Sequence, residues 1–466
     1  MLEKNEEYEV TIENFGANGE GVARINNFAV FIPFALPGEL VKIKIVKVKR
    51  NFAYGKLLEV IKPSKIRRSA ECPVFHKCGG CNMQHISYSE QLKIKSAAVR
   101  DCLAKTADIN IHVPLTESCE NEYRYRNKFQ LPVRNTPKGN VVGLFREGTH
   151  EVVPIDDCLI QKKWASCLIQ AVKNYIDTGI SCFNEENKEG YLKHVVAREV
   201  CGKMLIVLVV TERKLKNIDC FIDLLKTWFS DFSVFVNYNA GNGNVIFGSD
   251  FKLVYGEERT VAEVNGIKMP IGPESFMQVN DEVRDKIYAR VSELVGGDSK
   301  TAVIDAYSGA GFLTAVLAGK VGRAYGVECV AEAVACANEL ARANGLSDKI
   351  TNICGKCEEV LPDLVRRISG EYSSVSVVLD PPRKGCDVAV LNSLIEAKPQ
   401  KIVYVSCNPA TLARDLGILT GTLYYCGNEL KKTFTHNGLY KIEFIRPYDM
   451  FPNTKHVETV VLMSRR

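Results

Sequence analysis

The alternation of hydrophobic and polar residues divides this chain of 466 residues into regions with different periods. In residues 1–62, apolar and polar positions alternate in short runs, such as 8–12 and 28–33, which are separated by glycines. A period of two residues with glycine turns predicts a small, OB-like β-barrel. Residues 120–256 contain further short apolar runs and scattered helical patterns, which predict a β-rich central region.

The period changes again at about residue 260, where strand-like apolar runs begin to alternate with helical segments. Runs of the strand type occupy 302–307, 375–379 and 401–406. Strands that alternate with helices predict a mainly parallel sheet, so the expected fold class is α/β. A separate helix is predicted over 90–106.

The run 401–406 ends abruptly at Cys407, which is followed by Asn408 and Pro409. Asparagine caps free backbone N–H groups and proline suits a first helical turn, so a helix is predicted to begin here. Cys407 then lies at the carboxyl end of a strand and beside a helix N-terminus, where the backbone dipole favours a thiolate. This position predicts a nucleophile; the alternative is a half-buried structural cysteine.

Three other predicted strands end in residues that suit ligand binding. Gly309 lies in the turn after the first strand, Glu328 ends the second, and Asp380 follows 375–379. In a parallel sheet these residues and Cys407 share the edge where such sheets bind ligands. Glu328 follows the glycine turn at the distance of the acid that binds ribose in dinucleotide folds, but the third glycine of the pyrophosphate fingerprint is missing. The pattern therefore favours a nucleoside cofactor without pyrophosphate, such as S-adenosylmethionine.

Two further residues narrow the chemistry. The motif D-P-P-R at 380–383 has Arg383 where amino-group methyltransferases carry an aromatic ring, so transfer to an exocyclic amine is disfavoured. Glu458 alternates in phase with its apolar neighbours in the run 455–463, so its side chain is predicted to face inward. A buried carboxylate needs a partner or a chemical role. The alternative is a salt-bridged structural glutamate.

The clearest metal-binding pattern is the C-x5-C-x2-C spacing of Cys72, Cys78 and Cys81, with glycines between them. A zinc ribbon needs a second pair at ribbon spacing, which does not follow, and radical S-adenosylmethionine enzymes have a shorter first gap. An iron–sulfur cluster needs a fourth thiolate. The candidates are Cys102, Cys119, Cys158 and Cys167. Cys158 is favoured because it lies in a loop-like stretch; three unligated cysteines are the alternative.

Basic residues cluster in the predicted barrel, although the net charge of the chain is only +5. Strict alternation places Lys42 and Lys44 on one strand face. The cluster continues with Lys47, Lys49, Arg50, Lys56, Lys62, Lys65, Arg67 and Arg68. A basic face on such a barrel predicts binding of single-stranded RNA, with a solvated strand face as the alternative. Basic and aromatic residues also interleave in a predicted strand over 123–130, which suits phosphates and unstacked bases.

The composition indicates a reducing compartment. Seventeen cysteines without a secretory signal favour metal binding or catalysis over disulfides. The first seven residues are mostly polar or charged, and the longest aliphatic run, near 204–210, is too short to cross a bilayer. We therefore expect a cytoplasmic protein that does not associate with membranes, and we expect it to be a monomer.

Together these motifs resemble the S-adenosylmethionine-dependent RNA uracil-5-methyltransferase family. The resemblance is strongest to the ribosomal-RNA branch, which carries a TRAM domain and an iron–sulfur cluster, and it covers nearly the whole chain. It rests on the barrel, the cysteine loop and the motifs S-F-M-Q-V-N at 275–280, Y-S-G-A-G at 307–311, D-P-P-R at 380–383, S-C-N-P at 406–409 and H-V-E at 456–458.

This resemblance implies the domain organisation and the roles of the site residues. The implied domains are a TRAM RNA-binding barrel at 1–62, a central iron–sulfur and RNA-binding domain at 70–92 and 119–256, and a Rossmann-like methyltransferase domain at 93–118 and 260–466. The implied roles are S-adenosyl-L-methionine binding by Gln278, Tyr307, Glu328 and Asp380, nucleophilic attack by Cys407, proton removal by Glu458, and ligation of a 4Fe-4S cluster by Cys72, Cys78, Cys81 and Cys158. The chain differs from the family pattern at Phe312, because several relatives carry at this position an asparagine that contacts the cofactor.

The implied activity is methylation of carbon 5 of uridine in 23S ribosomal RNA, at a single-stranded or opened loop. A thiolate adds to carbon 6 of uracil so that carbon 5 can accept the methyl group, and a base then removes the carbon-5 proton. The alternatives are a tRNA uracil-5-methyltransferase, a cytosine-5 methyltransferase, and a non-catalytic RNA-binding protein on the same scaffold. The joint presence of Cys407, Glu458 and Asp380 favours catalysis, because binding alone does not need them.

Overall fold

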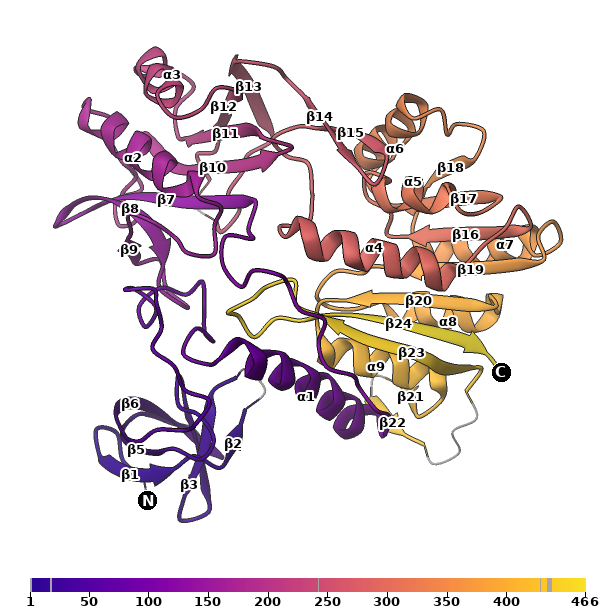
Figure 1. Ribbon diagram of the computed structural model, residues 1–466, viewed down its shortest axis with the longest axis horizontal. Helices are drawn as coiled ribbons and strands as arrows, with labels where there is room; N and C mark the ends of the chain where they lie inside the picture. Colours follow the sequence, from indigo (N-terminus) through magenta and orange to yellow (C-terminus); the bar gives the residue numbers. More distant parts are fainter. Residues whose placement is uncertain (1, 17–18, 242, 428, 434–437) are drawn as a thin grey trace.

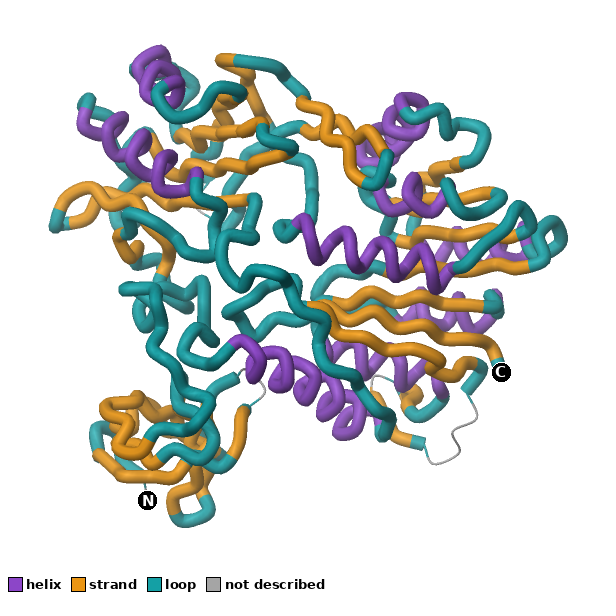
Figure 2. The backbone as a smooth tube through the Cα atoms, in the orientation of Figure 1, coloured by secondary structure: helices purple, strands orange, loops and turns teal. Residues whose placement is uncertain are grey.

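The computed structural model describes residues 2–16, 19–241, 243–427, 429–433 and 438–466. The described chain forms three regions, which Figure 1 shows in sequence colours and Figure 2 by secondary structure. No helix in the described part of the chain is long and apolar enough to cross a membrane.

The amino-terminal region is a six-stranded sheet that curls into a small barrel, drawn in indigo in Figure 1. Its order is β1-β5-β6-β4-β3-β2, with β1 (Glu7–Thr11), β2 (Asn14–Phe15), β3 (Gly21–Ile25), β4 (Phe28–Ile32), β5 (Leu40–Val48) and β6 (Phe52–Lys62). Val41, Ile43 and Ile45 of β5 are fully buried, whereas the intervening Lys42 and Lys44 are partly exposed. The predicted barrel and its alternation are confirmed.

A buried carboxylate attaches the barrel to the segment that follows it. The side chain of Glu39 is fully buried and accepts hydrogen bonds from two backbone N–H groups, at 2.8 and 3.1 Å. The Arg67 guanidinium donates to both Glu39 oxygens, at 2.5 and 2.7 Å. Arg68 pairs in the same way with Glu122 of the central region. Arg67 and Arg68, which the charge pattern assigned to an RNA-binding face, are therefore partly buried structural residues.

The central region is a seven-stranded mixed sheet with the order β13-β12-β11-β10-β7-β8-β9. Its strands are β7 (Lys128–Thr136), β8 (Gly139–Phe145), β9 (Val152–Pro154), β10 (Leu192–Val200), β11 (Lys203–Val210), β12 (Phe232–Tyr238) and β13 (Asp250–Tyr255). Helices α2 (Trp164–Asp177) and α3 (Ile218–Lys226) pack against it through a core that includes Tyr175, Phe221 and Val234. The predicted β-rich region is confirmed.

The strand predicted over 123–130 is wrong in its first part, because β7 begins only at Lys128. Arg124 has a left-handed backbone conformation, with φ 59°, which a strand does not accommodate. The backbone N–H groups of Arg124 and Arg126 instead donate to carbonyls just after Cys158, at 2.8 and 2.9 Å. Pairing with this distant segment decides the local structure, and periodicity carries no information about it.

The third region is a seven-stranded sheet between two layers of helices, as Figures 1 and 2 show. Its order is β18-β17-β16-β19-β20-β24-β23, with β16 (Thr301–Ala306), β17 (Arg323–Glu328), β18 (Ile350–Cys354), β19 (Ser374–Leu379), β20 (Lys401–Ser406), β23 (Tyr440–Tyr448) and β24 (Glu458–Arg465). The first five strands pair in parallel, whereas β24 is antiparallel to both of its neighbours. The predicted α/β fold is confirmed.

Helices cover both faces of this sheet. One layer consists of α4 (Asp281–Val295), α5 (Phe312–Ala318) and α6 (Ala331–Ala343), and packs with Val303 and Val378. The other consists of α1 (Tyr88–Ala107), α7 (Cys357–Ile368), α8 (Val388–Ala397) and α9 (Pro409–Thr420), and packs with Ile304 and Val377. Helix α1 precedes the central region in sequence but lies against α9. Two hairpins complete the region, β14 (Thr260–Val264) with β15 (Ile267–Ile271), and β21 (Leu423–Cys426) with β22 (Glu429–Lys432).

The Glu39–Arg67 pair makes the stability of the barrel dependent on pH. Burial alone would raise the pKa of Glu39, but Arg67 and the two backbone donors outweigh it and hold that pKa below its ordinary value. The stabilisation is therefore fully present above about pH 4.5, near the pKa of an unfolded glutamate, and is lost as the pH falls further.

Glu39→Gln is expected to lower the free energy of unfolding at pH 7 by about 2 kcal/mol, because hydrogen bonds to a charged group are lost. Denaturation of the full chain at pH 7 and at pH 4 measures the effect, which should shrink at the lower pH. Glu7→Gln is the matched control, since its pair with Lys42 is exposed. Equal losses in the two variants would contradict the structural role of Glu39.

Candidate active site

A cavity of about 570 Å³ lies at the carboxyl edge of the parallel strands. Five of the six residues predicted to bind the cofactor or to act in catalysis line it: Gln278, Tyr307, Asp380, Cys407 and Glu458. Four of them lie at strand ends, and the fifth lies in the segment before α4. The fold therefore brings together residues that are far apart in the sequence.

Two turns fix the backbone around Cys407. The Asn408 side chain accepts a hydrogen bond from the Ala410 backbone N–H, at 3.0 Å, and caps α9 as predicted. Its amide nitrogen donates to the Arg383 carbonyl, at 3.2 Å. Because Arg383 belongs to the loop after β19, the turn that carries the cysteine is tied to the turn that follows Asp380.

Burial raises the pKa of the Cys407 thiol to about 11. The carboxyl groups of Glu458 and Asp380 contribute to this rise, whereas the Arg383 guanidinium opposes it. The net shift of the pKa is upward even though a backbone hydrogen bond at Cys407 lowers it, because desolvation of a charged sulfur is the largest contribution.

Glu458 is the first residue of β24 and is only 5% exposed, so its side chain is buried as the alternation predicted. Burial raises the pKa of its carboxyl well above the ordinary value; Asp380 adds to the rise and Arg383 opposes it. Burial also raises the pKa of Asp380, to about 6. The cavity thus gathers one thiol and two carboxyl groups, Cys407, Glu458 and Asp380, whose pKa values are all raised by burial.

Glu328, the sixth predicted residue, is not among the described residues that line this cavity. Its carboxylate accepts hydrogen bonds from the backbone N–H groups of Gly309, at 3.1 Å, and Val330, at 2.9 Å. Gly309 has φ 52°, and a Cβ atom there would meet no atom within 4 Å. Glu328 therefore braces the turn after Tyr307, beside the cavity, and the turn is open on its outer side.

Several residues that line the cavity had no predicted role: Arg284, Tyr288, Asp305, Phe451 and His456. Asp305 is 1% exposed, burial raises its pKa to about 7, and its carboxyl accepts a hydrogen bond from the Thr314 hydroxyl at 2.6 Å. An acid inside the apolar run of β16 was the available signal for Asp305. Phe451 lies in a loop whose position depends on distant contacts, so no local signal marked it. His456 belongs to the H-V-E motif at 456–458, but the motif gave it no role of its own.

A second cavity, of about 310 Å³, is lined by the four cysteines predicted to ligate a cluster: Cys72, Cys78, Cys81 and Cys158. Burial raises the pKa of all four thiols, to about 12 for Cys81 and about 11 for Cys158. Neighbouring thiols add to the rise for both of these residues. Among the described residues, however, no group of three or more His, Cys, Asp or Glu side chains is arranged to hold a metal ion.

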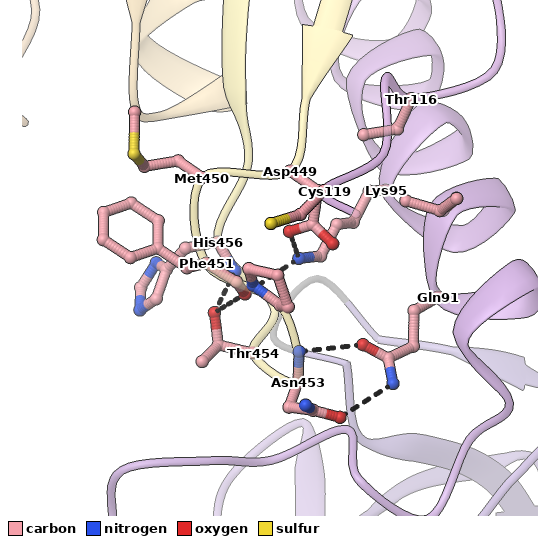
Figure 3. A network of polar contacts seen from close by, with 12 residues as sticks. Gln91, Lys95, Thr116, Cys119, Asp449, Met450, Phe451, Asn453, Thr454 and His456 are labelled. Atoms are coloured by element: carbon pink, nitrogen blue, oxygen red, sulfur yellow. Dashed lines mark hydrogen bonds and ion pairs between the residues drawn. The ribbon is translucent and has the colours of Figure 1, made fainter. Parts of the chain in front are cut away.

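The two cavities share part of their lining, because Arg383, Phe451 and His456 face both. The ring centroids of Phe451 and His456 are 6.0 Å apart. Both residues belong to the loop between β23 and β24, which Figure 3 shows with its neighbours. Burial, with Arg383 as the next contribution, lowers the pKa of His456 to about 4, so its imidazole is neutral at physiological pH.

Comparison with known families accounts for most of the chain. A model of the TRAM domain matches residues 2–58, and a model described as tRNA (Uracil-5-)-methyltransferase matches residues 87–466. The chain belongs to this uracil-5-methyltransferase family. The family resemblance and the enzyme class predicted from the motifs are thereby confirmed.

Similar proteins align with nearly the whole length of the methyltransferase. A Bacillus cereus protein described as an uncharacterized RNA methyltransferase is 40% identical, over 100% of this chain and 98% of its own length. A Clostridium tetani protein with the same description is 37% identical, over 99% of this chain and 97% of its own length. The crystal structure of Pyrococcus abyssi tRNA (uracil-54, C5)-methyltransferase with S-adenosyl-L-homocysteine covers 98% of this chain and 100% of its own, with 25% identity and a TM-score of 0.75. This likeness supports the Rossmann-like fold.

Arg383→Met is expected to raise the pKa of Cys407, because the guanidinium opposes the effects of burial and of the nearby carboxyl groups. The measurement is the rate at which iodoacetamide alkylates Cys407 between pH 7 and pH 10, followed by mass spectrometry of its peptide. In the wild-type methyltransferase the rate should still be rising at pH 10, and it should be lower in Arg383→Met at every pH. Lys384→Met, which changes the exposed neighbour, is the control. Equal rates in all three proteins would remove Arg383 as an electrostatic partner of the thiol.

Proposed function

We propose that this methyltransferase transfers a methyl group from S-adenosyl-L-methionine to carbon 5 of a uridine in 23S ribosomal RNA. The observation that carries the proposal is the joint position of Cys407, Glu458 and Asp380 around one cavity at the carboxyl edge of the sheet. A protein that only binds RNA needs neither a buried thiol nor a buried carboxyl group at that edge. A uracil-5-methyltransferase needs a nucleophile and a base there.

We assign the cofactor to the side of the cavity formed by Gln278, Tyr307 and Asp380, with Glu328 beside it. The residues fit a nucleoside ligand, because the turn at Gly309 is open and the carboxyl groups of Glu328 and Asp380 lie at the ends of β17 and β19, the two strands that flank β16. When bound, S-adenosylmethionine supplies the methyl group and a positive sulfonium charge, which favours the ionised forms of nearby carboxyl and thiol groups. The Pyrococcus abyssi enzyme, which covers the same regions, holds S-adenosyl-L-homocysteine.

Cys407 is the proposed nucleophile. Its thiol loses a proton to solvent, and the sulfur then forms a bond to carbon 6 of uracil. The electron pair of the carbon 5–carbon 6 double bond moves toward carbon 5 and the adjacent carbonyl oxygen. Carbon 5 thereby becomes nucleophilic enough to take the methyl group. Sulfur suits both halves of the reaction, because it attacks readily and leaves readily.

Glu458 is the proposed base for the step that follows methyl transfer. Its carboxylate accepts the proton from carbon 5, the C–H electron pair re-forms the carbon 5–carbon 6 double bond, and the bond from carbon 6 to the Cys407 sulfur breaks. Burial raises the pKa of Glu458 and so disfavours the ionised carboxylate that this step needs. The positive charge of Arg383 favours that ionisation.

The TRAM barrel is the proposed additional contact for RNA. Phe31, Phe52 and Tyr54 form an aromatic cluster, with ring centroids 5.5, 5.5 and 6.1 Å apart. Tyr54 is exposed, and its strand partner in register is the exposed Lys47. Exposed rings beside cations stack with unpaired bases and contact phosphates, so a single-stranded or opened RNA loop fits this surface.

The four cysteines are the proposed ligands of a 4Fe-4S cluster. Four thiolates are the donor set that such a cluster takes, and Cys72, Cys78, Cys81 and Cys158 all line one cavity. The loop between them approaches the central region closely, since a Cβ atom at Gly79 would lie 2.8 Å from a backbone nitrogen. When bound, the cluster would supply positive charge that stabilises the four thiolates. All seventeen cysteines are free in the structure, which suits the reducing cytoplasm where we place the protein.

Transfer RNA is the second candidate substrate. The matching family model carries a tRNA description, and the Pyrococcus abyssi relative is a tRNA (uracil-54, C5)-methyltransferase. The experiment maps 5-methyluridine in ribosomal and transfer RNA from cells with and without this protein. Loss of the modification from 23S ribosomal RNA is the expected result. Loss of 5-methyluridine from tRNA alone would select tRNA as the substrate. Loss of 5-methylcytosine instead would contradict both candidates and indicate a cytosine-5 methyltransferase.

The order of the two catalytic steps can be read from the variants. Cys407→Ala should form no covalent RNA complex and no product. Glu458→Gln keeps the size of the side chain but cannot accept a proton, so a denaturant-resistant protein–RNA adduct that carries the methyl group should accumulate. Gel electrophoresis with methyl-labelled cofactor detects it. Glu443→Gln, on the exposed side of β23, is the control. Normal turnover without an adduct in Glu458→Gln would remove Glu458 as the base.

The cluster proposal predicts a coloured protein. Methyltransferase purified without oxygen should be brown and contain about four irons per chain. Cys78→Ser should lose both the colour and the iron, whereas Cys354→Ser, which changes an exposed cysteine elsewhere, should keep them. Stoichiometric zinc in the wild-type protein would show that the cluster assignment is wrong.

A further inference from the structure

The loop that separates the two cavities is deeply buried. We call it the strap; it consists of residues 449–457 and connects β23 to β24. Its side chains Phe451 and His456 face both cavities, and Glu458 follows it directly. Three of its residues are fully buried: Asp449, Met450 and Asn453. A loop in this position depends on contacts from outside the hairpin that it closes.

Asn453 interlocks with Gln91 of α1. The Asn453 backbone N–H donates to Gln91 Oε1 at 2.9 Å, and Gln91 Nε2 donates back to Asn453 Oδ1 at 3.1 Å. The fully buried Gln91 amide also donates to the carbonyls of Met83 and Ile86, at 3.1 and 3.0 Å. Figure 3 shows the two amides facing each other between α1 and the strap. Asn453 itself has φ 66°, a backbone conformation that needs such support.

The segment after the cysteine loop reaches the strap as well. The backbone N–H groups of Asn82 and Met83 donate to the Asn453 carbonyl, at 3.1 and 3.0 Å. The Lys455 backbone N–H donates to Asn82 Oδ1, at 2.8 Å. Because Asn82 follows Cys81 directly, the strap is bonded to the chain that lines the cysteine cavity.

Lys95 provides a second attachment from α1. Its side chain is 1% exposed, and its ammonium donates to Asp449 Oδ1 at 2.5 Å and to the Phe451 carbonyl at 3.1 Å. Gln91 and Lys95 are four residues apart and therefore share one face of the helix. Most lysines turn to solvent, as Lys93 does, because a buried ammonium is costly even when it is paired.

We propose that Gln91 and Lys95 are positioning residues of the methyltransferase, which fix the strap so that Phe451 and His456 form the cavity wall next to Glu458. The inference rests on the proposed function. A buried ion pair contributes little net stability compared with apolar residues of the same shape, so stability alone does not account for Lys95. The second hydrogen bond of Lys95, to the strap backbone, fixes the geometry of the wall. Displacing such a wall by about 1 Å can lower a rate by up to about 100-fold.

The first experiment replaces one amide. Gln91→Met keeps the length of the side chain and removes its hydrogen bonds to the strap. It should lower kcat for RNA methylation at least about tenfold while KM for RNA and the Kd of S-adenosyl-L-homocysteine stay within about twofold. Lys93→Met, on the exposed side of the same helix, should leave all three unchanged. Wild-type kcat in Gln91→Met would overturn the proposal.

The second experiment guards against a variant that fails to fold. Lys95→Met combined with Asp449→Leu replaces both buried charges with apolar side chains. Such a replacement of a buried ion pair usually costs little stability. The double variant should melt within a few degrees of the wild type but show the same loss of kcat, because the bond to the strap backbone is gone. The exposed pair Lys105→Met with Asp101→Leu is the matched control. If the double variant is both stable and fully active, Lys95 does not position the strap for catalysis and the proposal is overturned for this residue.

Hydrogen exchange separates failure of this inference from failure of the proposed function. In the protein without RNA, the amides of Asn453, Asn82 and Met83 should exchange faster in Gln91→Met than in Lys93→Met. Unchanged exchange would overturn the inference even if the enzyme methylates uracil as proposed. The opposite outcome is that the wild-type protein methylates no uracil while the strap amides still exchange faster in Gln91→Met. That outcome would overturn the proposed function but would leave the attachment of the strap established.

Discussion

Parallel pairing of the strands β16 to β20 is the constraint on which the candidate site depends. Parallel strands end at one edge, and each is followed there by a turn whose backbone is free of the sheet ladder. The antiparallel β24 then brings its first residue, rather than its last, to the same edge. Since Ser406 pairs with Thr459, the next positions along the two strands are Cys407 and Glu458. One reversed strand therefore places the proposed base beside the proposed nucleophile.

Desolvation governs the chemistry of that edge. The thiol of Cys407 and the carboxyls of Glu458 and Asp380 all have raised pKa values because the protein buries them. Arg383 opposes the shift at Cys407 and at Glu458 but does not cancel it. Burial disfavours the ionised forms of this thiol and of these carboxyl groups, and positive charge that arrives with a ligand would favour those ionised forms. Proton release is thereby linked to binding.

The sequence allowed the fold to be predicted and marked residues that the structure places around one cavity, because strand ends leave local signals. Cys407 followed an apolar run and preceded a capped helix, and Asp380 closed another run. Long-range pairing was not predictable in the same way: Arg67 belongs to a charge run in the sequence, yet its partner Glu39 lies 28 residues away and is fully buried. Phe451 lies in a loop that only tertiary contacts place. Periodicity reports which face of an element is apolar, and it carries no information on which distant group satisfies a polar side chain.

The attachment of the strap also has a consequence for how the protein is made. Gln91 and Asn453 are separated by 362 residues, so the bonds between them close one of the longest loops in the chain. A ribosome adds roughly 5–20 residues each second, and the helix that carries Gln91 must therefore wait many seconds for its partner. During that interval the wall between the cavities does not exist. Nascent chains remain without a complete site until the strap and Glu458 have emerged, so methyl transfer cannot begin before those residues are synthesised.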